Sequence, residues 1–268
     1  MVSLIDSHCH LNFDQFDPDR EAVIERAVAQ GIQRFVIPGV DLPTSRSALA
    51  LAQSHPGLIY AALGSHPNEP ERWDTQARDE MRRLAEKPWV IAIGEIGLDF
   101  YRELGSHEQQ IKKFKEQLAL AAEVALPVIV HNRQAMNTLM PILSEWYSTL
   151  STQAPGLETH PGILHAFEGS LEEGRALIAM NFLIGVGGPV TYKNAPGKQA
   201  VVAALPLEAL MTETDAPYLS PHPYRGQRNE PKNILPIAEK IALLHNRPLS
   251  EVASQIYQNA ARVFAWGV

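Results

Sequence analysis

Short apolar segments alternate with longer amphipathic segments along nearly the whole chain. The apolar segments are rich in β-branched residues and lack polar alternation, which is typical of parallel strands buried on both faces. The amphipathic segments repeat apolar residues every three or four positions, which predicts helices. The predicted strands are residues 2–5, 32–37, 58–63, 89–93, 126–130, 163–164, 182–186 and 207–211.

Nearly every predicted strand is followed by a predicted helix. In the clearest helix, residues 108–125, Phe114 and Leu118 lie on one apolar face, and Lys112 and Lys113 lie off it. Residues 148–162 are rich in Ser, Thr, Pro and Gly, which predicts an exposed loop. The other predicted helices are residues 20–30, 44–54, 75–86, 136–147, 171–180, 198–204, 231–245 and 249–266.

Eight strand–helix units in 268 residues predict a single-domain (β/α)8 TIM barrel over residues 1–268, with closing C-terminal helices. The rival fold is a doubly wound open sheet. That fold would more naturally show a G-x-G-x-x-G fingerprint after its first strand, whereas this chain has His-Cys-His there.

Composition narrows the class of protein. The net charge of −7 argues against a basic protein that grips nucleic acid over a wide surface, but it allows a phosphate at a locally positive site. The single cysteine, Cys9, rules out an intrachain disulfide and fits a reducing compartment. We see no apolar segment of membrane-spanning length and no secretory signal, so we expect a cytoplasmic protein.

Polar residues interrupt the apolar pattern where the predicted strands end. His8 and His10 are two positions apart, so in an extended chain they point the same way. The ends of parallel barrel strands converge on one mouth, where active sites are built. We therefore expect one site formed by His8, His10, His66, Glu95, His131, His165 and Asp215.

This set has more ligands than one divalent ion needs, so it favours a binuclear centre with ions about 3.5–4 Å apart. Glu95 is the candidate bridge, because its strand lies opposite the strand that leads to His8 and His10. Imidazole and carboxylate ligands do not distinguish Zn, Mn, Mg, Fe and Ni. Two divalent ions bring four positive charges, and Glu95, Asp215 and a bridging hydroxide bring three negative ones. The site therefore keeps about one positive charge, which suits an anionic substrate.

Basic residues also follow the predicted strand ends. Each alone is typical of a solvated surface, but their shared position predicts that some contact a phosphate backbone. His131-x-Arg133 is the most suggestive pair. The residues are Arg102, Arg133, Lys193, Arg225, Arg228 and Lys232.

Two further residues, His66 and Asp99, have two possible roles each. His66 either touches substrate phosphate or makes a structural hydrogen bond. Asp99 either orients a ligand histidine or caps a loop. Asp6 faces the same side as His8, so we expect it behind the metal ligands, whereas Cys9 points away and packs.

Five sequence blocks and one shorter segment resemble the TatD-type metal-dependent deoxyribonucleases, in the same order and over almost the whole chain. The blocks are Asp6–Leu11, Gly64–Pro67, Ile93–Asp99, Leu126–Arg133 and Glu213–Leu219, and the segment is Arg228–Pro231. The resemblance implies a TIM barrel of the amidohydrolase superfamily that hydrolyses phosphodiesters in DNA. It implies one ion on His8, His10, Glu95 and Asp215, and another on Glu95, His131 and His165.

The chain departs from that family at two places. His165-Ala166-Phe167-Glu168-Gly169-Ser170 stands where the family usually has His-Cys-Phe-Ser-Gly-Ser, so Glu168 adds a negative charge near the predicted mouth. This charge is expected to weaken or narrow substrate binding. The 148–162 segment is also longer than usual.

The leading functional hypothesis is a metal-dependent phosphodiesterase that acts on DNA. Asp215 and Glu95 are its predicted catalytic residues, and His66, Arg133 and Arg228 its predicted substrate contacts. The alternatives are a lactonase or cyclic amidase, a small-molecule phosphoesterase and a non-catalytic metal-binding module. We expect a monomer with no membrane or obligatory protein partner. The polarity of cleavage and the choice between DNA and RNA are left open.

Overall fold

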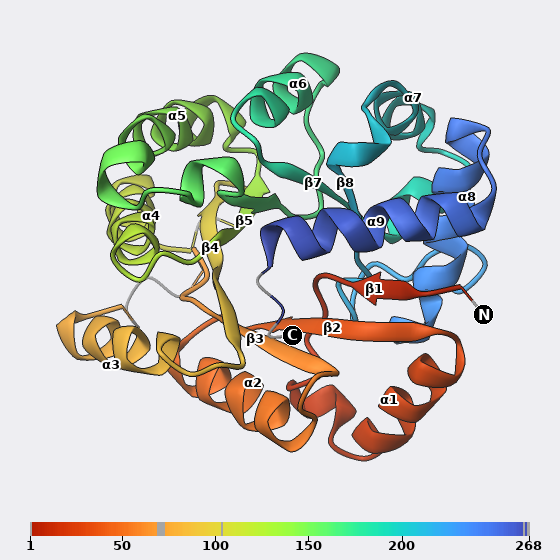
Figure 1. Cartoon of the computed structure of the whole chain (residues 1–268), viewed down its shortest axis with the longest axis horizontal. Coiled ribbons are helices and arrows are strands. Elements are labelled where there is room, and N and C mark those ends of the chain that lie inside the picture. Colours follow the sequence, from red (N-terminus) through yellow and green to blue (C-terminus); the bar gives the residue numbers. More distant parts are fainter. Residues whose placement is uncertain (1, 69–72, 103, 265, 267–268) are drawn as a thin grey trace.

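The computed structural model describes residues 2–68, 73–102, 104–264 and 266. Its centre is a sheet of eight parallel strands that pair in sequence order, each with the next along the chain (Figure 1). The strands are β1 (Leu4–Asp6), β2 (Ile32–Pro38), β3 (Ile59–Leu63), β4 (Val90–Asp99), β5 (Val128–Arg133), β6 (Gly162–Leu164), β7 (Leu183–Val186) and β8 (Leu210–Thr212).

The last strand lies against the first, which nearly closes the sheet into a barrel. The backbone N–H of Ser7 donates to the carbonyl of Thr212 at 3.0 Å. The Thr212 hydroxyl donates to the carbonyl of Ile5 at 2.8 Å. The predicted (β/α)8 barrel is therefore confirmed.

Helices surround the strands, as Figure 1 shows. None in the described ranges is both long and apolar enough to cross a membrane. They are α1 (Arg20–Ala29), α2 (Leu42–Ser54), α3 (Thr75–Ala85), α4 (His107–Glu123), α5 (Met136–Gln153), α6 (Leu171–Ala179), α7 (Pro196–Ala204), α8 (Ile234–His245) and α9 (Leu249–Val263). Short 3-10 helices are η1 (Asp14–Phe16), η3 (Leu157–Thr159), η4 (Gly188–Thr191), η5 (Leu207–Ala209) and η6 (Pro231–Asn233).

Helix α9 and Trp266 cover the end of the barrel where the strands begin. Asn259 of α9 donates to the carbonyl of Leu210, the first residue of β8, at 2.8 Å. The ring of Trp266 lies 4.8 Å from that of Tyr60, near the start of β3. The opposite end, where the strands finish, is left free for a site.

Side-chain caps define where several helices begin. Ser106 and Ser170 each accept a backbone N–H of the first turn, and Gln109 and Glu173 return the bond to the cap residue. Such capping boxes satisfy backbone donors that have no partner within the helix. They begin α4 and α6 directly after the loops that follow β4 and β6.

The prediction of an exposed loop over residues 148–162 is wrong for its first part, because α5 continues to Gln153. Leu143, Trp146 and Leu150 are buried at helical spacing, and the Trp146 ring N–H donates to the carbonyl of Leu118 at 2.8 Å. This packing outweighs the weak helix propensity of the Ser and Thr residues. The last predicted helix ends earlier than expected, at Val263; residue 265 lies outside the described residues.

Strand β4 is longer than predicted and carries its polar residues within the sheet. It runs to Asp99, so Glu95 lies inside the strand rather than after it. Gly97 has a φ of 145°, and a Cβ there would lie 2.0 Å from the carbonyl oxygen of His131. Glycine therefore allows β4 to pass close to β5 beside the predicted ligands.

Candidate metal centre

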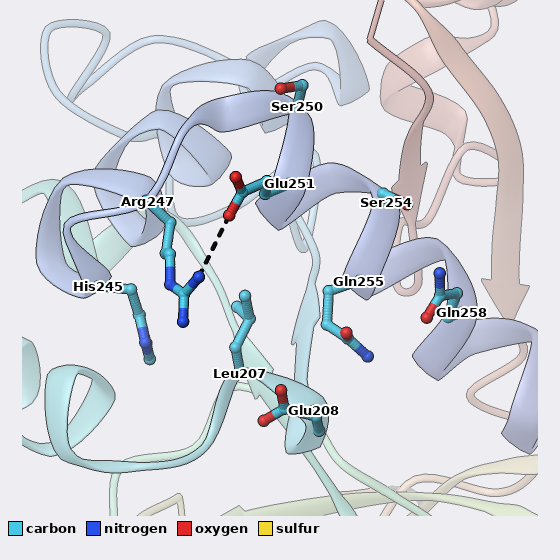
Figure 2. Close-up of a pocket in the computed structure, with 9 residues that line it drawn as sticks. All are labelled: Leu207, Glu208, His245, Arg247, Ser250, Glu251, Ser254, Gln255 and Gln258. Atoms are coloured by element: carbon cyan, nitrogen blue, oxygen red, sulfur yellow. Dashed lines mark hydrogen bonds and ion pairs between the residues drawn. The ribbon is translucent and has the colours of Figure 1, made fainter.

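Two cavities lie at different parts of the barrel. One, of about 520 Å³, lies beside α9 and the start of β8 (Figure 2). Its Arg247 pairs with Glu251 at 3.4 Å, and its His245 contacts the carbonyl of Val202 at 3.1 Å. Its histidine and arginine thus already have protein partners, and we place no metal there.

The other cavity, of about 560 Å³, lies where the strands end. Its walls include residues in or after β1 to β6 and β8. The predicted site residues that line it are His10, His66, Glu95, His131, Arg133, His165 and Asp215. His8 lies below them, fully buried.

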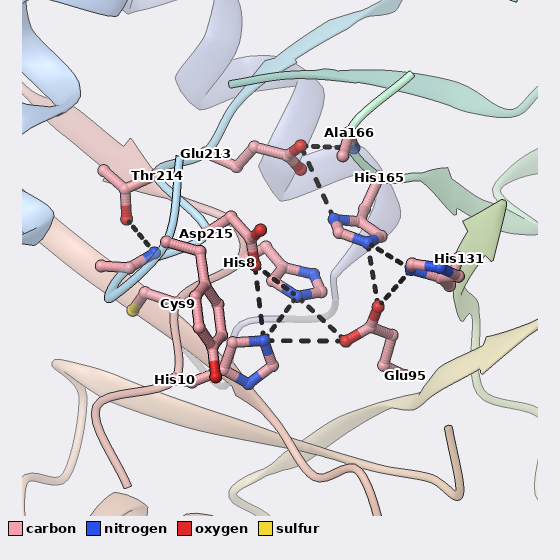
Figure 3. A network of polar contacts seen from close by, with 12 residues as sticks. His8, Cys9, His10, Glu95, His131, His165, Ala166, Glu213, Thr214 and Asp215 are labelled. Carbon is pink, nitrogen blue, oxygen red and sulfur yellow. Dashed lines mark hydrogen bonds and ion pairs between the residues drawn. The ribbon is translucent and has the colours of Figure 1, made fainter. Parts of the chain in front are cut away.

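The first group of candidate ligands joins both ends of the chain. The Nε2 atoms of His8 and His10 lie 3.2 Å apart. Each lies 3.3–3.7 Å from Oε2 of Glu95 and from Oδ1 of Asp215 (Figure 3). The two histidines follow β1 rather than lie in it, but they converge as predicted.

The second group shares Glu95 through its other oxygen. Oε1 of Glu95 lies 2.8 Å from Nδ1 of His131 and 2.9 Å from Nε2 of His165. These two ring nitrogens are 3.2 Å apart. Nε2 of His66 lies 3.5 Å from the same carboxylate oxygen, so His66 is a further candidate ligand as well as a wall of the cavity.

The donor atoms fit divalent cations. Four ligands placed tetrahedrally at about 2.1 Å from an ion are separated by about 3.4 Å. The first group matches this spacing, and the second lies slightly closer together. Two imidazole nitrogens and the oxygens of two carboxylates converge on one buried point, and a cation there would satisfy the lone pairs of all four ligands. Imidazole and carboxylate suit several divalent metals.

A third group of possible ligands, His8, His165 and Glu213, is less suitable. The rings of His8 and His165 are stacked, with centroids 3.9 Å apart and planes 11° from parallel. The lone pairs of stacked rings lie in two parallel planes, so they do not converge on one ion. We therefore assign these two histidines to different groups.

The histidines and carboxylates of the cluster influence each other's ionisation. Burial opposes ionisation of Glu95, but the surrounding His165, His8 and His66 hold the pKa of this carboxyl well below its ordinary value. Burial and the neighbouring His131 lower the pKa of His66 to about 3. Burial opposes protonation of His131 and His165, but the carboxylates that face them raise the pKa of both rings. A cation that binds there would therefore displace protons from these histidines.

A carboxylate stands behind each histidine of the second group. Oδ2 of Asp99 lies 3.6 Å from Nε2 of His131. Oε1 of Glu213 lies 3.7 Å from Nδ1 of His165 and accepts the backbone N–H of Ala166. Such carboxylates orient ligand imidazoles.

Asp99 caps the loop after β4, and its position facing His131 also suits the orienting role that we considered for it. Besides facing His131, it accepts the backbone N–H groups of Tyr101 and Arg102, each at 3.0 Å. Glu213 was not predicted as a functional residue. Its signal in the sequence was a carboxylate two residues before Asp215, at the end of a buried strand.

Asp6 binds the backbone at the β1–β8 junction. Its carboxyl accepts the Thr214 N–H at 2.9 Å and the Thr214 hydroxyl at 2.5 Å. Burial raises its pKa to about 8. Asp6 thus supports the segment that carries Asp215, and its one bond to a ligand residue is with the His8 backbone N–H at 3.3 Å.

Two predicted substrate contacts occupy different positions. Arg133 lines the cavity. Arg228 is absent from the described residues that line it, and its guanidinium binds both carboxylate oxygens of Asp19 at 2.8 Å. The donors of Arg228 are thus already engaged by carboxylates, and its role as a substrate contact stays a prediction. The sequence did not reveal this pairing, since the partners are 209 positions apart.

Glu168 lies at the cavity wall, as its position after β6 suggested. Its side chain is 60% exposed, and Oε1 lies 3.8 Å from Nζ of Lys198. Of the six basic residues after strand ends, Arg102 and Arg133 are those that line the cavity within the described chain.

A polar face of α4 holds two of the site loops, which the sequence analysis missed. Gln117 exchanges two hydrogen bonds with the backbone of Ser65, and Gln110 does the same with Asp99. Lys113, which we placed off the buried face, is buried and donates to the carbonyl of His66 at 2.5 Å. The only sequence signal was the spacing of these three residues on one side of the helix.

Comparison with known proteins agrees with this geometry. The family model of TatD related DNase matches residues 5–265. The chain belongs to the TatD related DNase family. This confirms the family that the sequence motifs indicated, and with it the class of TatD-family metal-dependent hydrolases.

Individual members of the TatD family align over nearly the full chain. The metal-dependent hydrolase YabD of Bacillus subtilis is 41% identical over 97% of this chain and 98% of its own length. The 3'-5' ssDNA/RNA exonuclease TatD of Pantoea vagans is 36% identical over 97% of this chain and 99% of its own length. The crystal structure of YjjV, a TatD homologue from Escherichia coli, superimposes with a TM-score of 0.88 at 32% identity, covering 98% of each chain.

Proposed function

We propose that this protein is a nuclease that hydrolyses phosphodiester bonds in DNA at a binuclear metal centre. The observation that carries this proposal is the division of donor atoms into two groups that share the two oxygens of Glu95. A carboxylate placed in this way could hold two cations, one on each oxygen. We further propose that residues 1–268 form one domain that acts as a monomer.

The proposed ligands of one ion are His8, His10, Glu95 and Asp215. Those of the other are Glu95, His131 and His165, with His66 beside them. Two divalent cations bound there would supply a water nucleophile at neutral pH and would stabilise the charge that develops on the phosphoryl oxygens. Zinc, manganese, magnesium, iron and nickel all remain compatible with these donors.

Asp215 is the proposed proton acceptor. Its side chain is 14% exposed, against 4% for Glu95, so it is the carboxylate of the first group that opens more to the cavity. Burial opposes its ionisation, but the hydrogen bond from His10 and the nearby His8 and His165 lower its pKa. It is therefore ionised at neutral pH and able to orient an attacking water and accept its proton.

Arg102 and Arg133 lie on the cavity wall formed by the ends of β4 and β5. Guanidinium groups bind phosphate oxygens through charge-assisted hydrogen bonds. We infer that the N–H edges of these two guanidinium groups hold phosphates of the substrate strand, which leaves their planar faces available for other contacts. The names of the Pantoea relative and its counterparts suggest single-stranded DNA or RNA, cut from the 3' end.

The decisive experiment combines metal analysis with digestion of end-labelled single- and double-stranded DNA. We expect the metal-loaded wild type to degrade DNA and Glu95→Ala to lose this activity while retaining its circular dichroism spectrum. Glu172→Gln, at an exposed position of α6, is the control. Undiminished activity of Glu95→Ala would refute the scheme.

A comparison of substrates separates the alternatives. A phosphodiesterase should hydrolyse bis-nitrophenyl phosphate much faster than nitrophenyl acetate. The opposite order would favour an esterase or lactonase. Hydrolysis of the small phosphodiester without degradation of DNA would indicate a small-molecule phosphoesterase, and bound metal without turnover would indicate a binding module.

A further inference from the structure

Two exposed large apolar side chains, Tyr218 and Leu219, line the metal-site cavity. Contiguous exposed apolar surface beside a groove is typical of ligand-binding sites. Of the other exposed large apolar residues in the described chain, Tyr101, Leu104 and Tyr224 follow β4 or β8 outside the cavity lining, and Val28 and Leu243 lie on helices.

Tyr218 presents its ring beside the first group of ligands. It lines the cavity, is 49% exposed and lies 6.4 Å from the ring of His10. Its backbone N–H donates to the carbonyl of Asp215 at 2.8 Å, and its carbonyl accepts from Asn229 at 2.7 Å. These bonds fix the tyrosine relative to a proposed ligand and leave its ring free.

A second flat surface lies across the cavity. The guanidinium of Arg133 stacks over the ring of Tyr101, with Cζ 4.0 Å from the ring centroid. Arg133 ends β5 and lines the cavity, and the backbone of Tyr101 is tied to Asp99 at the end of β4. In a barrel of eight strands in sequence order, β4 and β8 are opposite each other. The stacked pair and Tyr218 therefore flank the candidate metal centre.

We propose that Tyr218 and the Arg133–Tyr101 pair are base-stacking residues, each binding the base on one side of the scissile phosphate. Aromatic rings and guanidinium planes bind unstacked bases through their faces. Two surfaces on opposite walls can be filled only when neighbouring bases are separated from each other. The requirement for a single strand or a frayed end would then reside in these side chains. This inference rests on the proposed nuclease function.

The test uses single-stranded oligonucleotides with and without the base at the terminal or the penultimate nucleotide. Tyr218→Ala should lower kcat/KM on the intact strand by about 5- to 150-fold, the range expected for loss of one base–aromatic stack. Tyr218→Phe keeps the flat ring and should restore most of the activity. On one of the two abasic strands, Tyr218→Ala and the wild type should have the same kcat/KM, because the base that Tyr218 binds is already missing.

Tyr101→Ala should also lower kcat/KM on the intact strand, and its kcat/KM should equal that of the wild type on the other abasic strand. The matched control is Tyr224→Ala, since Tyr224 is an exposed tyrosine of the β8 loop outside the cavity lining. Equal losses on intact and abasic strands, at equal metal content, would overturn the stacking roles while leaving the nuclease function intact. Failure of the metal-loaded wild type to cut any oligonucleotide would overturn both.

Discussion

At the scale of single residues, the carboxylates behind the ligands distinguish this site from a simple cluster of histidines. Glu213 is fully buried, and a Cβ on Gly185 would lie 2.4 Å from its Oε2. The glycine therefore makes room for this carboxylate. Its Oε1 accepts the N–H of Ala166 and faces His165, so we expect Glu213 to set the orientation of that histidine.

Replacing Glu213 tests this positioning role. Glu213→Gln keeps the shape but removes the charge that faces His165, so we expect metal affinity to fall by about 10- to 100-fold with the fold retained. Metal titration would measure the affinity, and circular dichroism would show whether the fold is retained. Glu208→Gln, at an exposed carboxylate, should bind metal like the wild type. Unchanged affinity in Glu213→Gln would leave the carboxylate with a packing role only.

The guanidinium of Arg228 is chemically suited to bind a substrate phosphate, but its contacts in this structure stabilise the fold. Hydrogen bonding from Arg228 is the main cause that lowers the pKa of Asp19 to about 2. A depressed carboxyl pKa stabilises the folded state above the ordinary pKa near 4. That stabilisation is lost as the pH falls through about 2.

We therefore expect Arg228→Met to reduce stability rather than substrate binding. Both partners are about one-third exposed, so the loss should be about 1 kcal/mol, or a Tm lower by about 2–4 °C at pH 7. The difference should be smaller at pH 3. Arg83→Met, at an exposed arginine of α3, is the control. A KM for DNA that rises tenfold without a change in Tm would restore Arg228 as a substrate contact.

At the scale of elements, α4 has two functions on two faces. Its apolar face, with Phe114 and Leu118, packs in the barrel core. Its polar face, with Gln110, Lys113 and Gln117, binds the backbone after β3 and at the end of β4. The helix thereby holds the segments that carry His66 and Asp99.

Gln117→Leu tests this second function. The change removes two buried hydrogen bonds to Ser65, of 2.7 and 3.0 Å. We expect the free energy of unfolding in urea to fall by about 2–6 kcal/mol, because each of the two lost buried partners costs about 1–3 kcal/mol. Lys112→Leu, at an exposed position of the same helix, should change it by less than about 0.5 kcal/mol. Equal effects of the two variants would contradict the assignment.

At the scale of the whole molecule, the proposed ions connect the ends of the chain. The first group combines His8 and His10, after β1, with Asp215, after β8, and with Glu95 on β4. Bound cations would hold the barrel together across the junction where the sheet closes. Metal binding and folding should therefore be linked.

Removal of the metal should show this linkage. At a free metal concentration about 100 times Kd, each ion adds about 2.7 kcal/mol, so two ions add about 5.4 kcal/mol. For a chain of this size this raises Tm by roughly 10–20 °C. Chelation should abolish hydrolysis and lower Tm by this amount, and titration should restore both at two ions per chain. Saturation at one ion would contradict the binuclear assignment. An unchanged Tm would contradict the linkage.

The sequence alone determined the order of strands and helices, the barrel, the family and the residues at the strand ends. It could do so because hydrophobic periodicity reports which faces are buried, and because parallel strands must direct their ends to one mouth. The convergence of His8, His10, Glu95, His131, His165 and Asp215 follows from that rule.

Only the tertiary structure decided which atoms face each other. His131 directs Nδ1 to Glu95, whereas His165 directs Nε2 to it. This difference depends on Asp99 and Glu213, which lie behind the two rings. The partners of Arg228, the polar face of α4 and the extension of α5 likewise depend on contacts between distant segments. Local sequence patterns carry no information on such contacts, because side-chain pairing is set by the packing of elements that are far apart in the chain.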